Sequence, residues 1–164
     1  EVEGRLEEIA KNDDRIRRVQ TIPGVGRKTA EVLVTALDDV NRFDNARQVS
    51  AYIGLVPRQY QSGETDRNGR ITKRGSRLLR TMLLECAWAS LRYNPWAKEV
   101  YQRICGGQKT RKKKAAIALA RKIAVVAWAM LKHGTDWDPK RLRIDTEPEP
   151  SAGNGRRKDS AGTA

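Results

Sequence analysis

The sequence has little histidine and cysteine, the residues that most often bind zinc. It contains one histidine and two cysteines among 164 residues. His133 has no partner at a zinc-ligand spacing, so no metal site is expected in this chain. Cys86 and Cys105 lie in separate helical segments without CxxC spacing. This pattern excludes a disulfide framework and is typical of a reducing cytoplasm.

Long apolar segments are also missing. The longest one, residues 115–131, is interrupted by Arg121 and Lys122. It therefore falls short of the ~20 apolar residues that span a bilayer. No basic, apolar and small-residue signal peptide opens the chain. A membrane partner is accordingly not expected.

Acidic residues are much less frequent than basic ones. Lys and Arg number 33 against 20 Asp and Glu, which gives a formal net charge of +13 and a pI of about 10.2. A surplus of this size favours a polyanionic partner, and we expect that partner to be DNA.

The apolar periodicity predicts a mainly α fold, a compact multi-helix domain with a disordered C-terminal tail. Its core is expected around Met82, Leu83, Leu119, Ile123 and Val126. We predict the end of a connecting helix or coiled coil at 1–20, the main domain at 21–137 and the tail at 138–164. Helices are predicted at residues 4–19, 28–37, 46–53, 75–92, 96–104 and 115–132, with Tyr52 and Leu78 among the inward-facing positions.

The chain begins with Glu1 rather than methionine, and its first twenty residues read as a charged helix already under way. We therefore expect a fragment, or a C-terminal domain whose partner domain lies upstream.

Residues 16–37 follow a helix-hairpin-helix pattern, in which Gly24-Val-Gly26 separates two helical segments and Lys28 follows. The glycines permit a tight turn with exposed N–H groups, and the next helix begins beside them. Together these groups can hold one DNA phosphate. The alternative is a glycine turn that only packs two helices together.

The most unusual stretch is a basic loop, residues 57–73, which is followed by a helix that begins near Gly75. A loop of this length is more often functional or disordered than merely connecting. Asn68-Gly69 could close a small β-hairpin inside it. The cations that we expect to bind phosphate are Arg58, Arg67, Arg70, Lys73, Arg74, Arg77 and Arg80.

A second basic block, Lys109–Lys114, precedes the most hydrophobic helix. Such a block is either a solvated helix lead-in or a phosphate contact, and the sequence favours neither. His133 and Gly134 are predicted to end that helix, with the histidine as a favourable charge at its C-terminus.

Ser62 is the candidate nucleophile of the basic loop. Ser62-Gly63 alone is an ordinary turn dipeptide, and no histidine is at hand for a hydrolase triad. The surrounding guanidinium groups, however, can stabilise the extra charge of a phosphodiester under attack. The product would be a phosphoseryl-DNA ester and a free 3′-hydroxyl. Because this ester conserves the bond energy, strand exchange would need no ATP.

Linked motifs with compatible gaps between Val19 and Leu131 resemble the C-terminal transposase domain of the IS-one-ten family of insertion-sequence recombinases, relatives of the pilin-gene invertase. The motifs are Ile22-Pro-Gly-Val-Gly26 with Thr29-Ala30, Arg42-Phe43, Ala51-Tyr52-x-Gly54-Leu55-x-Pro57, Gln61-Ser62-Gly63, Gly69-Arg70-Ile71-Thr72-Lys73-x-Gly75 and Leu79-Arg80.

This resemblance implies a two-domain enzyme in which an N-terminal acidic domain holds Mg²⁺ and the C-terminal domain supplies the serine that matches Ser62. Family members act as oligomers on DNA, and a structured bridge RNA directs some of them. The acidic domain is absent from these residues, so the chain itself is expected to bind no cofactor and to be inactive alone.

Two rival functions remain open at this point. One is a non-catalytic helix-hairpin-helix module for DNA or RNA, in which Ser62 is an ordinary turn residue. The other is a basic ribosome- or membrane-associated protein, which leaves the ordered Ser-Gly and Lys-x-Gly loop unexplained.

Overall fold

The computed structural model describes residues 13–142 except 63 and 64, and for 57–69 it describes only the course of the backbone. The described part is mainly helical, which confirms the predicted fold class. Its elements in order are α2 (Asp14–Gln20), α3 (Arg27–Leu37), the short 3-10 helix η1 (Val40–Arg42), α4 (Ala46–Ile53), β1 (Pro57–Ser62), β2 (Thr65–Ile71), α5 (Arg77–Tyr93), α6 (Pro95–Cys105), the 3-10 helix η2 (Lys109–Arg111) and α7 (Lys112–His133).

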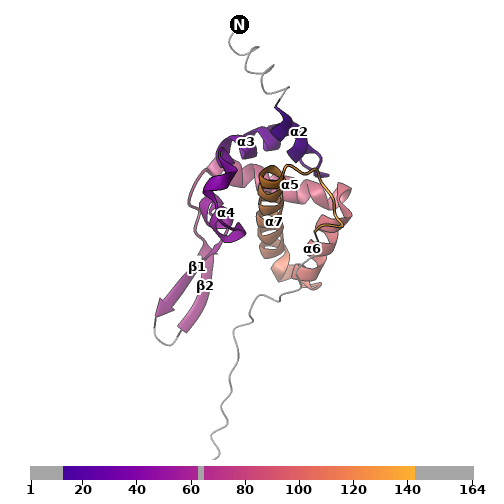
Figure 1. Ribbon diagram of the computed structural model, residues 1–164. Helices are drawn as coiled ribbons and strands as arrows, with labels where there is room; N and C mark the ends of the chain where they lie inside the picture. The colour runs from indigo at the N-terminus through magenta and orange to yellow at the C-terminus, as the bar shows by residue number, and fades with distance from the viewer. Residues whose placement is uncertain (1–12, 63–64, 143–164) are drawn as a thin grey trace, which may run out of the picture.

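Helix α7 is the centre of the domain, with α2 and α4 to α6 packed around it (Figure 1). Leu119 and Ile123 of α7 are completely buried, and Leu83 of α5 is buried with them. Val126 is buried as well, while Met82 is half-buried. The predicted core residues therefore lie where α5 and α7 meet.

Helix α7 also fixes the connection between α3 and α4. The indole of Trp128 donates a 2.9 Å hydrogen bond to the carbonyl of Val40, and Lys132 donates to the carbonyl of Phe43. Phe43, the single phenylalanine of the chain, is buried. These contacts attach η1 to the far half of α7, away from its basic start.

Two residues predicted to face inward are exposed. Tyr52 is 41% exposed and Leu78 is 59% exposed. The Tyr52 ring forms a tilted pair with Phe43, and the Arg42 guanidinium lies 4.5 Å from the Tyr52 ring centre. Leu78 precedes the part of α5 that meets the core. The prediction was wrong for these two residues because helical spacing does not show where a neighbouring helix stops.

A β-hairpin forms, but its turn differs from the predicted one. Strand β1 pairs antiparallel with β2, and Ser62 pairs with Thr65. Asn68 lies inside β2, opposite Gln59, rather than in the turn. The pairing then shifts so that Pro57 opposes Ile71, which leaves one extra residue in β2. Gly69 and Arg70 occupy this bulge, a position that also suits glycine.

The segment after α7 returns across the domain to α2. In this segment, the backbone N–H of Trp137 donates a hydrogen bond to the Thr21 hydroxyl at 2.9 Å. The Trp137 ring packs edge-on against Trp96 of α6. The Arg18 guanidinium donates to the carbonyl of Gly134 and pairs with Asp136. We call residues 134–142 the C-terminal strap.

Two predicted segments lie largely outside the described residues. These are the connecting helix at 1–20, of which only 13–20 are described, and the tail at 138–164, of which only 138–142 are described. Leu142 packs against the core. In the described part of the chain, no helix is both long and apolar enough to cross a membrane.

A candidate nucleic-acid interface

Ser62 is the last residue of β1, at the outer end of the hairpin. Figure 1 shows β1 and β2 projecting away from the helices, at the end of the molecule opposite α2 and α3. Arg58 belongs to β1, and Arg67 lies in β2 opposite Tyr60. The predicted nucleophile is thus carried on an extension of the domain.

The root of the hairpin is fixed to α4 by backbone contacts. The N–H of Thr72 donates to the carbonyl of Val56 at 2.9 Å, and the N–H of Lys73 donates to the carbonyl of Gly54 at 3.1 Å. Gly54 ends α4 in the left-handed conformation, with φ of 79°. A side chain on Gly54 would overlap the backbone of Arg74. Glycine is therefore required both for the turn and for the close approach of the two segments.

Gly75 makes the reciprocal contact. Its φ is 77°, and a side chain there would overlap the carbonyl oxygen of Tyr52. The two glycines interlock the end of α4 with the segment that leads into α5. This segment then enters α5 through Ser76, whose hydroxyl accepts a hydrogen bond from the N–H of Leu79.

Four predicted phosphate-binding cations surround this root. Arg70, Lys73, Arg74 and Arg77 are all exposed, and within the described part of the chain none of them forms an ion pair. The first turn of α5 contains no acidic residue, although the helix dipole favours one there. The side chains are therefore available to an external anion.

Arg80 is different, because its guanidinium is used inside the protein. One nitrogen, Nη1, donates to the carbonyls of Arg74 and Gly75 at 2.7 and 3.1 Å. Arg80 thereby holds the start of α5 against the segment that precedes it. The sequence placed Arg80 with the phosphate-binding residues, since its spacing from Arg77 gives no sign of these backbone acceptors.

We expect Arg77→Gln and Arg80→Gln to have different effects. Arg77→Gln should leave the free energy of unfolding within about 0.5 kcal/mol, because an exposed unpaired side chain contributes little to folding. Arg80→Gln should cost about 1.5–3 kcal/mol, the typical value of hydrogen bonds from a charged group. Urea denaturation of both variants measures this difference. Equal stability losses would contradict the internal role of Arg80.

The turn between α2 and α3 contains the other predicted phosphate-binding residues. Gly24 packs against α5, where its carbonyl accepts a 3.4 Å hydrogen bond from the Cys86 thiol. Burial raises the pKa of this thiol to about 11, so the thiol keeps its proton at neutral pH. Gly26 and Lys28 are exposed, and α3 begins at Gly26 without a side-chain cap. Only these last two residues face a possible ligand.

The structure does not bring all predicted site residues together. The turn at Gly24–Lys28 lies at the α2 and α3 end of the molecule, whereas the hairpin projects from the opposite end (Figure 1). The cations at the hairpin root lie nearer to Ser62 along the chain, and one of them, Arg70, belongs to β2 of the same hairpin. We therefore treat the hairpin with the start of α5 as one surface and the α2–α3 turn as a second one.

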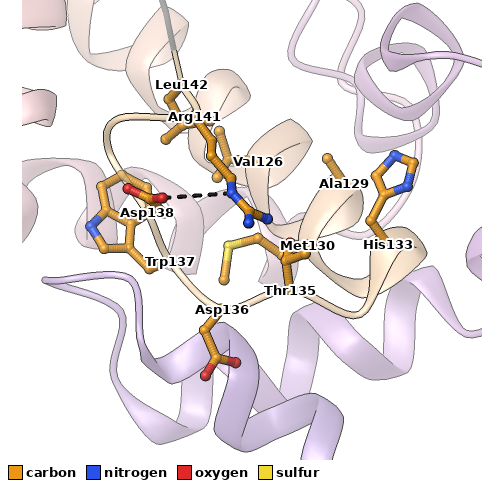
Figure 2. Close-up of a pocket in the computed structure, with 10 residues that line it drawn as sticks. All are labelled: Val126, Ala129, Met130, His133, Thr135, Asp136, Trp137, Asp138, Arg141 and Leu142. Atoms are coloured by element: carbon orange, nitrogen blue, oxygen red, sulfur yellow. Dashed lines mark ion pairs between the residues drawn. The ribbon is translucent and has the colours of Figure 1, made fainter.

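A cavity of about 250 Å³ lies apart from both surfaces, between the end of α7 and the C-terminal strap. Figure 2 shows Met130 and Trp137 at this cavity and the Arg141 guanidinium directed to the Asp138 carboxylate, 3.6 Å away. Its lining is mostly apolar. Among the described residues, no group of three or more His, Cys, Asp or Glu side chains could hold a metal ion.

Comparison with known proteins gives the family of the chain. A model of the transposase IS116/IS110/IS902 family matches residues 16–102, just over half of the sequence. The chain belongs to this family. The resemblance seen in the sequence motifs is thereby confirmed.

Curated relatives agree with this assignment. The chain is 39% identical over 137 residues to the transposase for insertion sequence element IS1111A of Coxiella burnetii, covering 79% of this chain and 36% of that protein. It is 36% identical over 137 residues to the IS1328 transposase of Yersinia enterocolitica, covering 82% and 41%. The pilin gene-inverting protein of Moraxella bovis is 30% identical over 128 residues, covering 77% and 39%. The chain thus spans well under half the length of these relatives.

Proposed function

We propose that the chain is the nucleophile-bearing domain of a DNA transposase, and that Ser62 attacks the DNA. The observation that carries this proposal is the position of Ser62 at the outer end of a hairpin whose root is surrounded by unpaired cations. Family membership supports it, because relatives of this chain carry the name transposase. A serine on a projecting hairpin can reach a scissile phosphate that the domain surface itself holds.

The proposed step is a transesterification. The Ser62 oxygen forms a bond to phosphorus, and the bond from phosphorus to the 3′-oxygen breaks. The hydroxyl loses its proton, and the departing 3′-oxygen gains one, so that the products are a phosphoseryl ester and a 3′-hydroxyl. One phosphodiester replaces another, and the reverse attack by a different 3′-hydroxyl would complete strand exchange.

The cations have two roles in this proposal. Arg70, Lys73, Arg74 and Arg77, at the hairpin root, bind phosphates that flank the reacting one. The α2–α3 turn acts as a helix-hairpin-helix contact, in which the N–H groups near Gly26 and the Lys28 ammonium bind one further phosphate. Such contacts position a duplex without reading its sequence.

The described residues of this chain do not fit the Mg²⁺ expected for the family. The described part offers no acidic cluster, and we therefore assign the metal to a domain outside these residues. Cleavage would accordingly need a longer protein. We propose that this protein acts as a homo-oligomer and that a bridge RNA is a further partner.

Trapping of a covalent protein–DNA adduct tests the role of Ser62. The longer parent protein is incubated with Mg²⁺, the DNA ends of its element and any RNA the element encodes. We expect an adduct with the wild type and none with Ser62→Ala, while DNA binding persists. Thr65→Ala is the matched control, since Thr65 pairs with Ser62 in the hairpin. This control should still form the adduct.

Other outcomes would assign the chain differently. An adduct that survives Ser62→Ala but is lost in Tyr60→Phe would move the nucleophile to Tyr60, the nearest tyrosine in β1. Persistent DNA binding with no adduct from any variant, under conditions in which strand exchange proceeds, would leave a non-catalytic helix-hairpin-helix module as the function of the chain.

A further inference from the structure

A second group of cations lies at the start of α7, outside the residues used in the proposed function. It consists of Lys109, Arg111, Lys112, Lys113 and Lys114, which we call the basic ridge. All five are exposed, and in the part of the chain that the structure describes none has an ion-pair partner. The ridge also follows the end of the family match at residue 102.

The basic ridge does not serve the stability of α7. The positive end of a helix dipole favours acidic residues, yet the first turn of α7 has none. Arg111 occupies the N-cap position, and its side chain makes no capping hydrogen bond. Five like charges within six residues also repel one another. A folding role would select the opposite composition.

The cations are nevertheless held on a rigid support. The turn before η2 is closed by a hydrogen bond from the N–H of Gln108 to the carbonyl of Cys105, and the Cys105 thiol donates to the carbonyl of Gln108 at 3.3 Å. The N–H of Arg111 in turn donates to Gln108. Helix α7 continues from this point into the core. The ridge therefore presents charges at fixed positions, unlike a basic tail.

The position of the ridge relates it to the hairpin. The end of α7 contacts α2 through Gly134 and Arg18, so its start lies at the other end of the molecule. The hairpin projects from that same end (Figure 1). A ligand along this end can meet both elements, whereas the α2–α3 turn is remote from it.

We propose that the basic ridge is a second contact for the phosphate backbone of double-stranded DNA, beside the hairpin. This inference rests on the proposed function, which supplies the DNA. A duplex fits better than a single strand, because proteins that hold single strands stack aromatic side chains on the bases and residues 109–114 contain none. Fixed cations suit the regular row of phosphates along a duplex.

The test uses the 164-residue chain and a random-sequence DNA duplex. Lys112→Gln/Lys113→Gln/Lys114→Gln should weaken binding about tenfold or more. It should also lower the slope of log affinity against log salt by up to about 0.9 for each lost phosphate contact. Fluorescence anisotropy across a salt series measures both. The midpoint of thermal unfolding should stay equal or rise, since the helix dipole disfavours these charges.

The matched control removes the same charge elsewhere. Arg92→Gln/Lys98→Gln/Lys140→Gln replaces three exposed cations that also lack ion-pair partners in the described part of the chain. We expect a clearly smaller loss of affinity. Equal losses in both triple variants would overturn the proposal, because net charge alone would then explain binding. Unchanged binding in the ridge variant would overturn it too.

Two further arms separate this inference from the proposed function. Arg70→Gln/Arg74→Gln tests the hairpin root. If that variant loses DNA affinity and the ridge variant does not, the ridge proposal fails while the hairpin surface stands. Loss of affinity in the ridge variant supports the ridge even if Ser62 proves not to be the nucleophile. The last arm repeats the binding measurement with a duplex RNA probe. If the ridge variant loses affinity for RNA but not for DNA, the assignment to DNA is overturned.

Discussion

Gly54→Ala is expected to destabilise the domain by roughly 3–5 kcal/mol, among the larger effects of a single substitution. Two costs combine at this position. An alanine in the left-handed region costs about 1–2 kcal/mol, and Gly54 has φ of 79°. Its new methyl group would also overlap the backbone nitrogen and oxygen of Arg74. Backbone atoms cannot rotate away as a side chain can, so the hairpin root must shift.

Gly106→Ala provides the matched comparison for this prediction. Gly106 ends α6 with φ of 56°, and a side chain there would meet no atom within 4 Å. It should therefore cost only the conformational part, about 1–2 kcal/mol. Urea denaturation gives both values, and limited proteolysis of the hairpin reports whether its root has loosened. Equal losses at Gly54 and Gly106 would show that the approach to Arg74 contributes nothing.

Gly24→Ala is the second substitution with a large expected effect, roughly 3 kcal/mol. The φ of Gly24 is 96°, and an added side chain would lie 2.7 Å from the Cα of Ser90. The turn and α5 would have to separate at a buried contact, because Ser90 is completely buried. Weaker DNA binding by this variant would then reflect a folding defect and say nothing about phosphate.

Gly26→Ala separates the two roles of the turn. Gly26 has φ of −79°, and a side chain would meet nothing within 4 Å. At this N-cap position alanine should cost at most about 1 kcal/mol. If a phosphate approaches the backbone here, the methyl group obstructs it, and DNA affinity should fall several-fold while folding persists. Thermal denaturation measures the stability of the variant, and fluorescence anisotropy measures its DNA affinity. Unchanged affinity would remove the turn from the phosphate path.

Local signals in the sequence predicted the helices well. Gly54, Gly106 and Gly134 each end a helix in the left-handed conformation. Such ends depend on a few adjacent residues, so they can be read without knowledge of the fold. The hairpin turn was harder to predict, because Asn68-Gly69 suits a bulge as well as a turn, and only the pairing partners decide between them.

The candidate site was predictable as a set of charges but not as an arrangement. Arg77 and Arg80 are both arginines at the start of the same helix, and the sequence gives no reason to distinguish them. Yet Arg77 is exposed, whereas Arg80 donates to two backbone carbonyls. Likewise Gly24 and Gly26 look like one motif, but Gly24 is a packing residue and Gly26 a surface residue. The role of Gly24 depends on its contact with Ser90 of α5, which lies far along the chain. The role of Arg80 depends on the backbone geometry of the segment before α5, which places two carbonyls within its reach.

Helix α7 and the C-terminal strap show that the match to the family model is shorter than the part of the chain that folds. The family match ends at residue 102, before α7. Yet α7 supplies the centre of the core, and the strap adds Trp137 against Trp96 and a hydrogen bond to Thr21. A protein cut at the limits of the family match would expose the buried faces of α5 and α6. A unit suited to expression and biophysics therefore needs to extend at least through Leu142.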